Sequence, residues 1–172
     1  MTEPRLTHVD ETGAARMVDV SEKAITTRVA TASGRVLVTP EVVALLRGTG
    51  VPKGDAVAVA RIAGIAGAKR TPDLVPLCHP IALHGVTVDL EVTDEGVEIT
   101  ATARTADRTG VEMEALTSVA VAGLTMIDMV KAVDPRASIT DVRLLAKSGG
   151  KSGDWTRSGP QDERAAGTEP PR

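Results

Sequence analysis

Two prolines bracket a short segment that contains both a thiol and an imidazole. In the stretch AKRTPDLVPLCHPIAL, Cys78 and His79 lie between Pro76 and Pro80. Proline fixes its own φ angle and restricts the residue before it to extended conformations. The spacing therefore predicts a stiff, non-helical segment that presents an imidazole, which titrates near neutral pH and can accept or donate a proton. A structural loop with Cys78 buried as a small hydrophobe is the alternative interpretation.

A metal site at this segment is not favoured by the spacing of its neighbours. His8 and His84 are the other histidines of the chain, and neither stands at zinc-ligand spacing from Cys78 and His79. Cys78 is the one cysteine, so no intramolecular disulfide is expected. We therefore expect no metal centre among these residues.

The longest helical pattern covers about residues 111–132, within GVEMEALTSVAVAGLTMIDMVKAV. Its apolar residues recur at helical spacing, which predicts a face packed in the core. The members of this predicted core stripe are Met113, Leu116, Ala120, Leu124, Ile127 and Val130. On spacing alone, Met113 is therefore expected to serve packing.

The same helix carries four charged residues, Glu112, Glu114, Asp128 and Lys131. Glu114 and Asp128 are only about 40° apart in azimuth, but about 21 Å apart along the axis, because a helix rises about 1.5 Å per residue. They cannot both hold one small molecule within a single subunit. Either the charges form an ordinary solvated edge, or a site is shared between subunits. Asp128 and Lys131 are surface neighbours, and an ion pair between them would keep the carboxylate ionised and oriented for proton transfer.

A third stretch, LLAKSGGKSGDW, places Lys147 and Lys151 around glycines. Glycines let backbone N–H groups approach a phosphate, and lysines supply positive charge. A Walker A motif is excluded, because Leu145 stands where that motif needs glycine and no helix signal follows. With Lys53 and Lys69, which stand in similar settings, these lysines are what a triphosphate would require. An ordinary flexible tail is the alternative.

The elements that must position these residues alternate between strand and helix patterns. A bent strand or hairpin is predicted over 25–38, with a turn at Ser33-Gly34, and Thr39-Pro40 opens a short helix. The further predicted elements are a helix over 53–69, strands over 85–93 and 96–105 joined by a tight turn, and a final strand over 139–147. This order predicts an α+β sandwich, in which helices pack on one face of an antiparallel sheet.

Length and composition predict one domain with an unusual core. The chain has 172 residues, no Phe, no Tyr and one Trp, so its interior must be built from aliphatic residues, Met and Ala. We expect a single α+β domain over 7–155 and a flexible N-terminus over 1–6. Residues 156–172 contain no apolar residue larger than Ala, which predicts a disordered C-terminal tail.

Charge and hydropathy exclude two classes of protein and favour one compartment. The net charge of −3 and the lack of aromatic platforms argue against nucleic-acid binding. The N-terminus has no apolar stretch of signal-peptide type, and no run approaches 18 apolar residues, so no membrane span is expected. A cytoplasmic location is the simplest expectation.

Five ordered stretches resemble the molybdenum cofactor biosynthesis protein C family. They are RMVDVSEK (16–23), KGD (53–55), ARIAGIAGAKRTPDLVPLCHP (60–80), GVEMEALTSVAVAGLTMIDMVKAV (110–133) and LLAKSGGKSG (144–153). The resemblance implies a ferredoxin-like fold, assembled as a homohexamer (a trimer of dimers) with active sites between subunits. It also implies a lyase that converts a 3′,8-cyclised dihydro-GTP to cyclic pyranopterin monophosphate and releases pyrophosphate.

Residue roles follow from the resemblance at matching positions. It implies that Asp128 is the catalytic acid/base, with Lys131 beside it and Lys53 as a further member of the catalytic set. The residues that it implies for substrate binding are Leu77, Cys78, His79, Glu112, Met113, Glu114, Lys69, Lys147 and Lys151, the last two towards the triphosphate. No cofactor is implied, although Mg²⁺ can accompany the triphosphate. Ile127 and Val130 replace an aromatic residue and a cysteine that are frequent in the family, which looks like a change of core packing.

Two other functions remain open from the sequence. One is a non-catalytic, nucleotide-binding regulator on the same fold, which would bind GTP and the cyclised nucleotide equally. The other is a structural oligomerisation module, which would bind no ligand.

Overall fold

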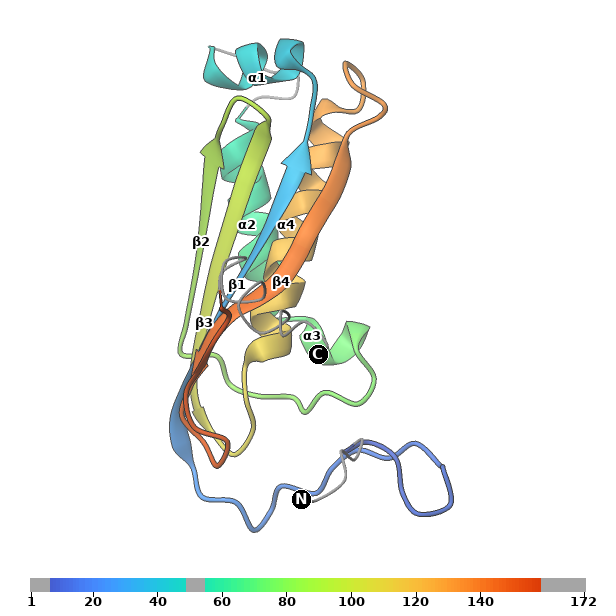
Figure 1. Cartoon of the computed structure of the whole chain (residues 1–172), viewed down its shortest axis with the longest axis vertical. Coiled ribbons are helices and arrows are strands. Elements are labelled where there is room, and N and C mark those ends of the chain that lie inside the picture. Colours follow the sequence, from blue (N-terminus) through green and yellow to red (C-terminus); the bar gives the residue numbers. More distant parts are fainter. Residues whose placement is uncertain (1–6, 49–54, 159–172) are drawn as a thin grey trace, which may run out of the picture.

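The computed structural model describes residues 7–48 and 55–158 of the chain (Figure 1). Within these residues it contains four helices and five strands. In chain order they are β1 (Thr26–Leu37), α1 (Pro40–Arg47), α2 (Ala56–Ala68), α3 (Thr71–Leu74), β2 (Gly85–Val92), β3 (Gly96–Asp107), α4 (Glu112–Val130), β4 (Ser138–Ser148) and β5 (Trp155–Thr156).

The strands form one sheet in the order β2-β3-β1-β4-β5, and all neighbouring strands are antiparallel. The helices α2 and α4 cover one face of this sheet (Figure 1). The succession β1-α2-β2-β3-α4-β4 gives the ferredoxin-like arrangement, in which each helix connects two strands that are not neighbours. The predicted α+β sandwich with helices on one face is therefore confirmed.

The core between sheet and helices is built from small aliphatic side chains. On β1, Ala30, Ala32 and Val36 alternate with more exposed residues and face the helices. The helices approach each other closely, because a Cβ atom at Gly64 of α2 would lie only 3.0 Å from the carbonyl oxygen of Ser118 on α4. Close approach of helices and sheet is how a chain without Phe or Tyr fills its interior.

The predicted turn at Ser33-Gly34 is wrong, because β1 continues through both residues. Glycine at this position serves packing. A Cβ atom at Gly34 would lie 2.6 Å from Cγ1 of Val119 on α4, so a larger residue would push the helix off the sheet. The sequence pattern could not separate a glycine that makes room from a glycine that makes a turn.

The helix α4 is confirmed, but its predicted core stripe is only partly right, because Leu116, Ile127 and Val130 pack in or against the core whereas Met113 and Leu124 are exposed. Of that stripe only Val130 is buried, whereas the side chains of Leu124 and Met113 are 60% and 40% exposed. The face that packs on the sheet and α2 consists mainly of smaller residues and Met, among them Ala115, Val119, Ala122, Met126 and Met129. Because α4 is apolar nearly all round, periodicity located the helix but not the direction of its buried face.

By length and composition α4 is also apolar enough to cross a membrane. In this fold it packs against the sheet and against α2, as the core helix of a soluble protein does. Burial in the core therefore accounts for the apolar residues on its inner side, whereas Leu124 and Met113 are exposed.

The C-terminal part of the domain extends slightly beyond the predicted boundary at residue 155. β5 pairs with β4, and the backbone N–H of Arg157 donates to the carbonyl of Leu145 at 2.7 Å. A one-turn helix, α3, precedes the segment from Pro76 to Pro80, which is itself non-helical, as predicted. The predicted flexible N-terminus over 1–6 and most of the predicted tail lie outside the described residues.

Candidate active site

A cavity of about 320 Å³ lies where three segments of the chain meet. Its walls come from the N-terminal segment, from the segment after α3, and from the start of α4. It brings together six residues that were predicted to bind substrate, namely Leu77, Cys78, His79, Glu112, Met113 and Glu114. Their functional roles stay predictions, but their common location makes the cavity the candidate active site.

His79 is held in the cavity wall by the N-terminal segment. Its Nε2 atom lies 2.8 Å from the carbonyl oxygen of Val18. Because a carbonyl can only accept, Nε2 must carry the proton of this hydrogen bond. In the neutral ring Nδ1 is then the acceptor, so His79 can take a proton at that atom.

Glu114 is the most deeply buried acidic residue of the cavity, with only 4% of its surface exposed. Burial, with a smaller contribution from the nearby charge of Glu112, raises the pKa of Glu114 to about 7. Burial likewise raises the pKa of the Cys78 thiol, and the Glu114 charge acts in the same direction. Glu114 can therefore exchange a proton near neutral pH, whereas Cys78 stays a thiol.

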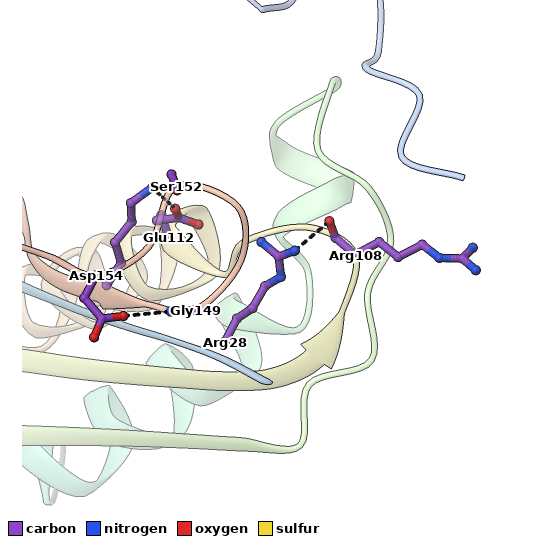
Figure 2. Close-up of polar contacts among 7 residues, drawn as sticks. Arg28, Arg108, Glu112, Gly149, Ser152 and Asp154 are labelled. Carbon is purple, nitrogen blue, oxygen red and sulfur yellow. Dashed lines mark hydrogen bonds and ion pairs between the residues drawn. The ribbon is translucent and has the colours of Figure 1, made fainter. Parts of the chain in front are cut away.

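Glu112 forms an ion pair that links α4 to the sheet. Nζ of Lys147 on β4 lies 3.0 Å from Oε1 of Glu112, and it also donates to Oγ of Ser152 at 3.2 Å. Figure 2 shows Glu112 and Ser152 facing each other where the loop between β4 and β5 passes the start of α4. Lys147 therefore joins one carboxylate of the cavity to the glycine-rich segment.

That glycine-rich segment has a conformation that glycine permits. Gly149 and Gly150 have φ angles of +85° and +74°, where side chains are strained. The N–H of Gly149 donates to Oδ1 of Asp154 at 3.1 Å (Figure 2). A Cβ atom at Gly150 would collide with the guanidinium of Arg28, so the loop lies directly on β1.

Arg28 is itself fixed by the end of β3. Its Nε donates to the carbonyl of Asp107 and its Nη2 to the carbonyl of Arg108, both at 3.0 Å. Figure 2 shows the guanidinium directed at the Arg108 carbonyl, while the Arg108 side chain points away. Arg28 thus places a fixed positive charge beside the segment that precedes α4.

Asp128 and Lys131 lie at the other end of α4. Nζ of Lys131 is 2.6 Å from Oδ1 of Asp128, and both side chains are exposed. Figure 1 shows α4 running from the end near α3 to the end near α1, so this ion pair lies far from the cavity within one chain. The predicted ion pair is present, and the predicted separation of Asp128 from Glu114 follows from the single helix that carries both.

The remaining predicted lysines are not gathered at the cavity of this chain. Lys69 caps the C-terminus of α2 and Lys151 lies in the β4–β5 loop, both exposed. Lys53 lies outside the described residues. Within the described ranges, no group of three or more His, Cys, Asp or Glu residues could hold a metal ion.

Comparison with known proteins assigns the chain to a family. The pattern of the MoaC family matches residues 17–150. The chain belongs to the MoaC family. The matched range contains Val18, Lys23 and every residue of the cavity from Leu77 to Glu114, as well as Asp128, Lys131 and Lys147.

Members of the MoaC family with curated names are similar over most of the chain. A cyclic pyranopterin monophosphate synthase of Streptomyces griseus is 73% identical over 160 residues, which is 93% of this chain and 90% of the relative. A protein of the same name from a Nocardioides species is 69% identical over 156 residues, covering 89% and 96%. Cyclic pyranopterin monophosphate synthase 2 of Mycobacterium tuberculosis is 60% identical over 152 residues, covering 88% and 91%.

The residue patterns of the sequence did not indicate the N-terminal wall of the cavity. Thr7, His8, Val18, Val20 and Lys23 line it, but their positions carry no periodicity or motif. The one available signal was the match of RMVDVSEK to the family, and it gave no role to Lys23. Only the folded chain brings this segment against His79.

Proposed function

We propose that this chain is a cyclic pyranopterin monophosphate synthase of molybdenum cofactor biosynthesis. The observation that carries the proposal is the cavity with Glu114, Cys78 and His79, in a chain that is 73% identical over 160 residues to a protein of that name. The substrate is the 3′,8-cyclised dihydro-GTP, and the products are cyclic pyranopterin monophosphate and pyrophosphate. The reaction belongs to the phosphorus–oxygen lyases, because the bond from the α-phosphorus to pyrophosphate is broken.

The reaction requires proton transfers and an anionic leaving group. The five-membered ring of the purine must open and be rebuilt as a pyranopterin, and this rearrangement needs groups that give and take protons near neutral pH. The buried Glu114, with its pKa of about 7, meets that need on one side of the substrate, and Nδ1 of His79 is a hydrogen-bond acceptor in the same cavity. The ion-paired carboxylate of Asp128 is the proposed acid/base on the other side.

The site is shared between subunits in this proposal. Asp128 and Lys131 can reach a substrate bound near Glu114 only if they come from a second copy of the chain. The apolar outer surface of the helices supports such an assembly, since Ile62 on α2 and Leu124 on α4 are 67% and 60% exposed. We propose the homohexamer, a trimer of dimers, that the family resemblance implies.

Lysines are the proposed ligands of the triphosphate. Lys53, Lys69 and Lys151 are assigned to it, and Lys23, which lines the cavity, is a further candidate. Their charges would stabilise the pyrophosphate as it leaves. No resident cofactor is part of the proposal, although Mg²⁺ can accompany the phosphates, and we place the reaction in the cytoplasm.

A turnover assay tests the proposal directly. Purified protein is mixed with the cyclised dihydro-GTP, and both pyrophosphate and the pterin product are followed. The wild type should form both, whereas Asp128→Asn should form neither. Asp94→Asn is the matched control, because it removes only an exposed ion pair with Arg47 and should keep full activity.

The opposite results would favour the other functions. Tight binding without product from the wild type, with equal affinity for GTP and the cyclised nucleotide, would indicate the non-catalytic regulator. Normal turnover by Asp128→Asn would show that the catalytic acid/base has been misassigned.

A further inference from the structure

The ammonium group of Lys147 contacts two side chains in the folded chain. Its ammonium lies between Oε1 of Glu112 and Oγ of Ser152, and the side chains of Lys147 and Glu112 are only 27% and 28% exposed. Hydrogen bonds between ionised groups in such a partly buried place are stronger than those on an open surface. This lysine is therefore committed to a carboxylate of the cavity wall.

Two carboxyl groups lie in the first turn of α4. Glu112 and Glu114 both line the cavity, and the charge of Glu112 contributes to the raised pKa of Glu114. Glu112 is neutralised by Lys147, whereas Glu114 is buried away from that lysine and no ion pair joins it to any described residue. Lys147 thus decides how strongly the charge of Glu112 acts on its neighbour.

We propose that Lys147 is a positioning residue: held by Ser152, its ammonium neutralises and orients Glu112, and this lets Glu114 exchange a proton with the bound substrate. The inference rests on the proposed function for its substrate, and it changes the role that the sequence indicated for Lys147. The glycine-rich segment then fixes the position of Lys147 and, through it, of the Glu112 carboxylate. Any contact of Lys151 with phosphate would be an additional role of this segment.

The geometry of the glycine-rich segment supports a bracing role. The N–H of Gly149, which a phosphate cradle would offer to an anion, is occupied by the carboxylate of Asp154. The segment lies against β1 at Thr27 and Arg28, where a Cβ atom on either Gly149 or Gly150 would collide. The negative charge of Asp154 would repel an anion in this loop. The ammonium of Lys147 is already paired with Glu112.

Space for the Glu112 carboxylate is provided by Gly110. A Cβ atom at residue 110 would collide with Oε2 of Glu112, so any side chain there would move the carboxylate. Gly110 therefore offers a way to disturb the ion pair without removing a charge.

Other titratable groups also face Glu114 across the cavity. They are His8 and Lys23 from the N-terminal segment and Cys78 and His79 from the segment after α3. Arg28 on β1 adds a fixed charge beside the glycine-rich segment. All of these remain unchanged in the variants described below, so a change in Glu114 can be assigned to Lys147.

Infrared titration of the full-length protein without substrate tests the coupling. The carboxyl C=O band of Glu114 is identified by its loss in Glu114→Gln. In Lys147→Met the midpoint at which this band disappears should move up by about one pH unit, because the uncompensated Glu112 charge holds the proton on the more buried Glu114. Arg143→Met removes a cation from the same strand, where its partner is Asp141, and should leave the midpoint unchanged. An unchanged midpoint in Lys147→Met would overturn the inference.

Kinetics separate a positioning role from a phosphate contact. Lys147→Met should lower kcat at least tenfold at neutral pH, move the pH profile of kcat upward and keep KM within about twofold. Lys147→Arg should recover most of the rate, because a guanidinium also pairs with a carboxylate. A tenfold rise of KM with an unshifted profile would make Lys147 a phosphate ligand and would overturn the inference.

The proposed function can fail separately from this inference. Absence of product from the wild type would contradict the proposed function. A shifted midpoint of the Glu114 band in Lys147→Met would still establish that Lys147 affects the titration of Glu114. If Lys147→Met does not fold, as judged by circular dichroism, Gly110→Ala replaces it. Displacement of Glu112 from Lys147 should then raise the Glu114 midpoint in the same direction, and an unchanged midpoint would again overturn the inference.

Discussion

Glu114 and Asp128 lie on the same helix, α4, but at its opposite ends. Fourteen residues separate them, which corresponds to about 21 Å along the axis. Glu114 is buried in a cavity, whereas Asp128 is exposed and paired with Lys131. If both act on one substrate, each site must take the beginning of α4 from one subunit and its end from another.

Mixed assemblies should recover activity that each variant lacks alone. Chains with Glu114→Gln and chains with Asp128→Asn are co-expressed and purified through two different tags. In hexamers assembled at random from the two chains, one site in four combines a native Glu114 from one subunit with a native Asp128 from another, so about a quarter of wild-type activity should return.

Asp128→Asn mixed with Lys131→Met is the matched control for that experiment. Both changes lie at the same end of α4, so every site in a mixed hexamer contains one of them and no activity should return. Equal rates from the two mixtures would contradict the shared site.

Glu114 should make the stability of the protein depend on pH. Its pKa rises from 4.5 to about 7 in the fold, so the native state binds the proton more tightly than the unfolded chain. The stability that this proton contributes is present below pH 4.5 and is lost as the pH rises to about 7, with an upper limit of about 3 kcal/mol.

Thermal unfolding of Glu114→Gln checks that prediction. The variant should lose less stability than the wild type between about pH 5 and pH 8. Glu91→Gln, at an exposed position on β2, should follow the wild-type curve. Parallel curves of stability against pH for Glu114→Gln and the wild type would show that folding does not raise the pKa of Glu114.

Gly34→Ala should destabilise the fold, because its Cβ atom would meet Val119 at 2.6 Å. Overpacking of this kind costs about 1–3 kcal/mol in chemical denaturation. Gly85→Ala on β2 is the control, since its nearest neighbour would be Cβ of Arg104 at 4.0 Å. It should change stability by less than about 0.5 kcal/mol. Equal effects of the two variants would rule out the packing role of Gly34.

Charges on the outer surface of the helices should break the assembly. Ile62→Glu combined with Leu124→Glu places two carboxylates on the exposed apolar side chains of α2 and α4. Light scattering should report smaller particles than for the wild type, and turnover should fall with them. Leu37→Glu, at the exposed end of β1, should leave the particle size unchanged. An intact assembly of the double variant would place the interface elsewhere.

Sequence patterns located most of the elements because their signals are local. Alternating residues marked β2 and β3, the Thr39-Pro40 signal marked the start of α1, and unbroken helical spacing marked α4. The ion pair of Asp128 and Lys131 was also predictable, since residues three apart on a helix are neighbours.

The orientation of the buried faces could not be predicted, because packing partners decide it. α4 is apolar on several sides, and only contact with the sheet and α2 buries Val119 and Met126 while leaving Leu124 exposed. The continuous course of β1 through Gly34 has the same origin, since the glycine accommodates a helix from elsewhere in the chain.

By itself the sequence determined the residue types of the site, the α+β class and the helix that separates Asp128 from Glu114. Only the tertiary structure decided that Val18 holds His79, that Lys147 pairs with Glu112 and that Glu114 is buried beside them. These contacts join residues 35 to 61 positions apart. Such pairs are set by how strands and helices pack, and no local pattern of residues encodes that packing.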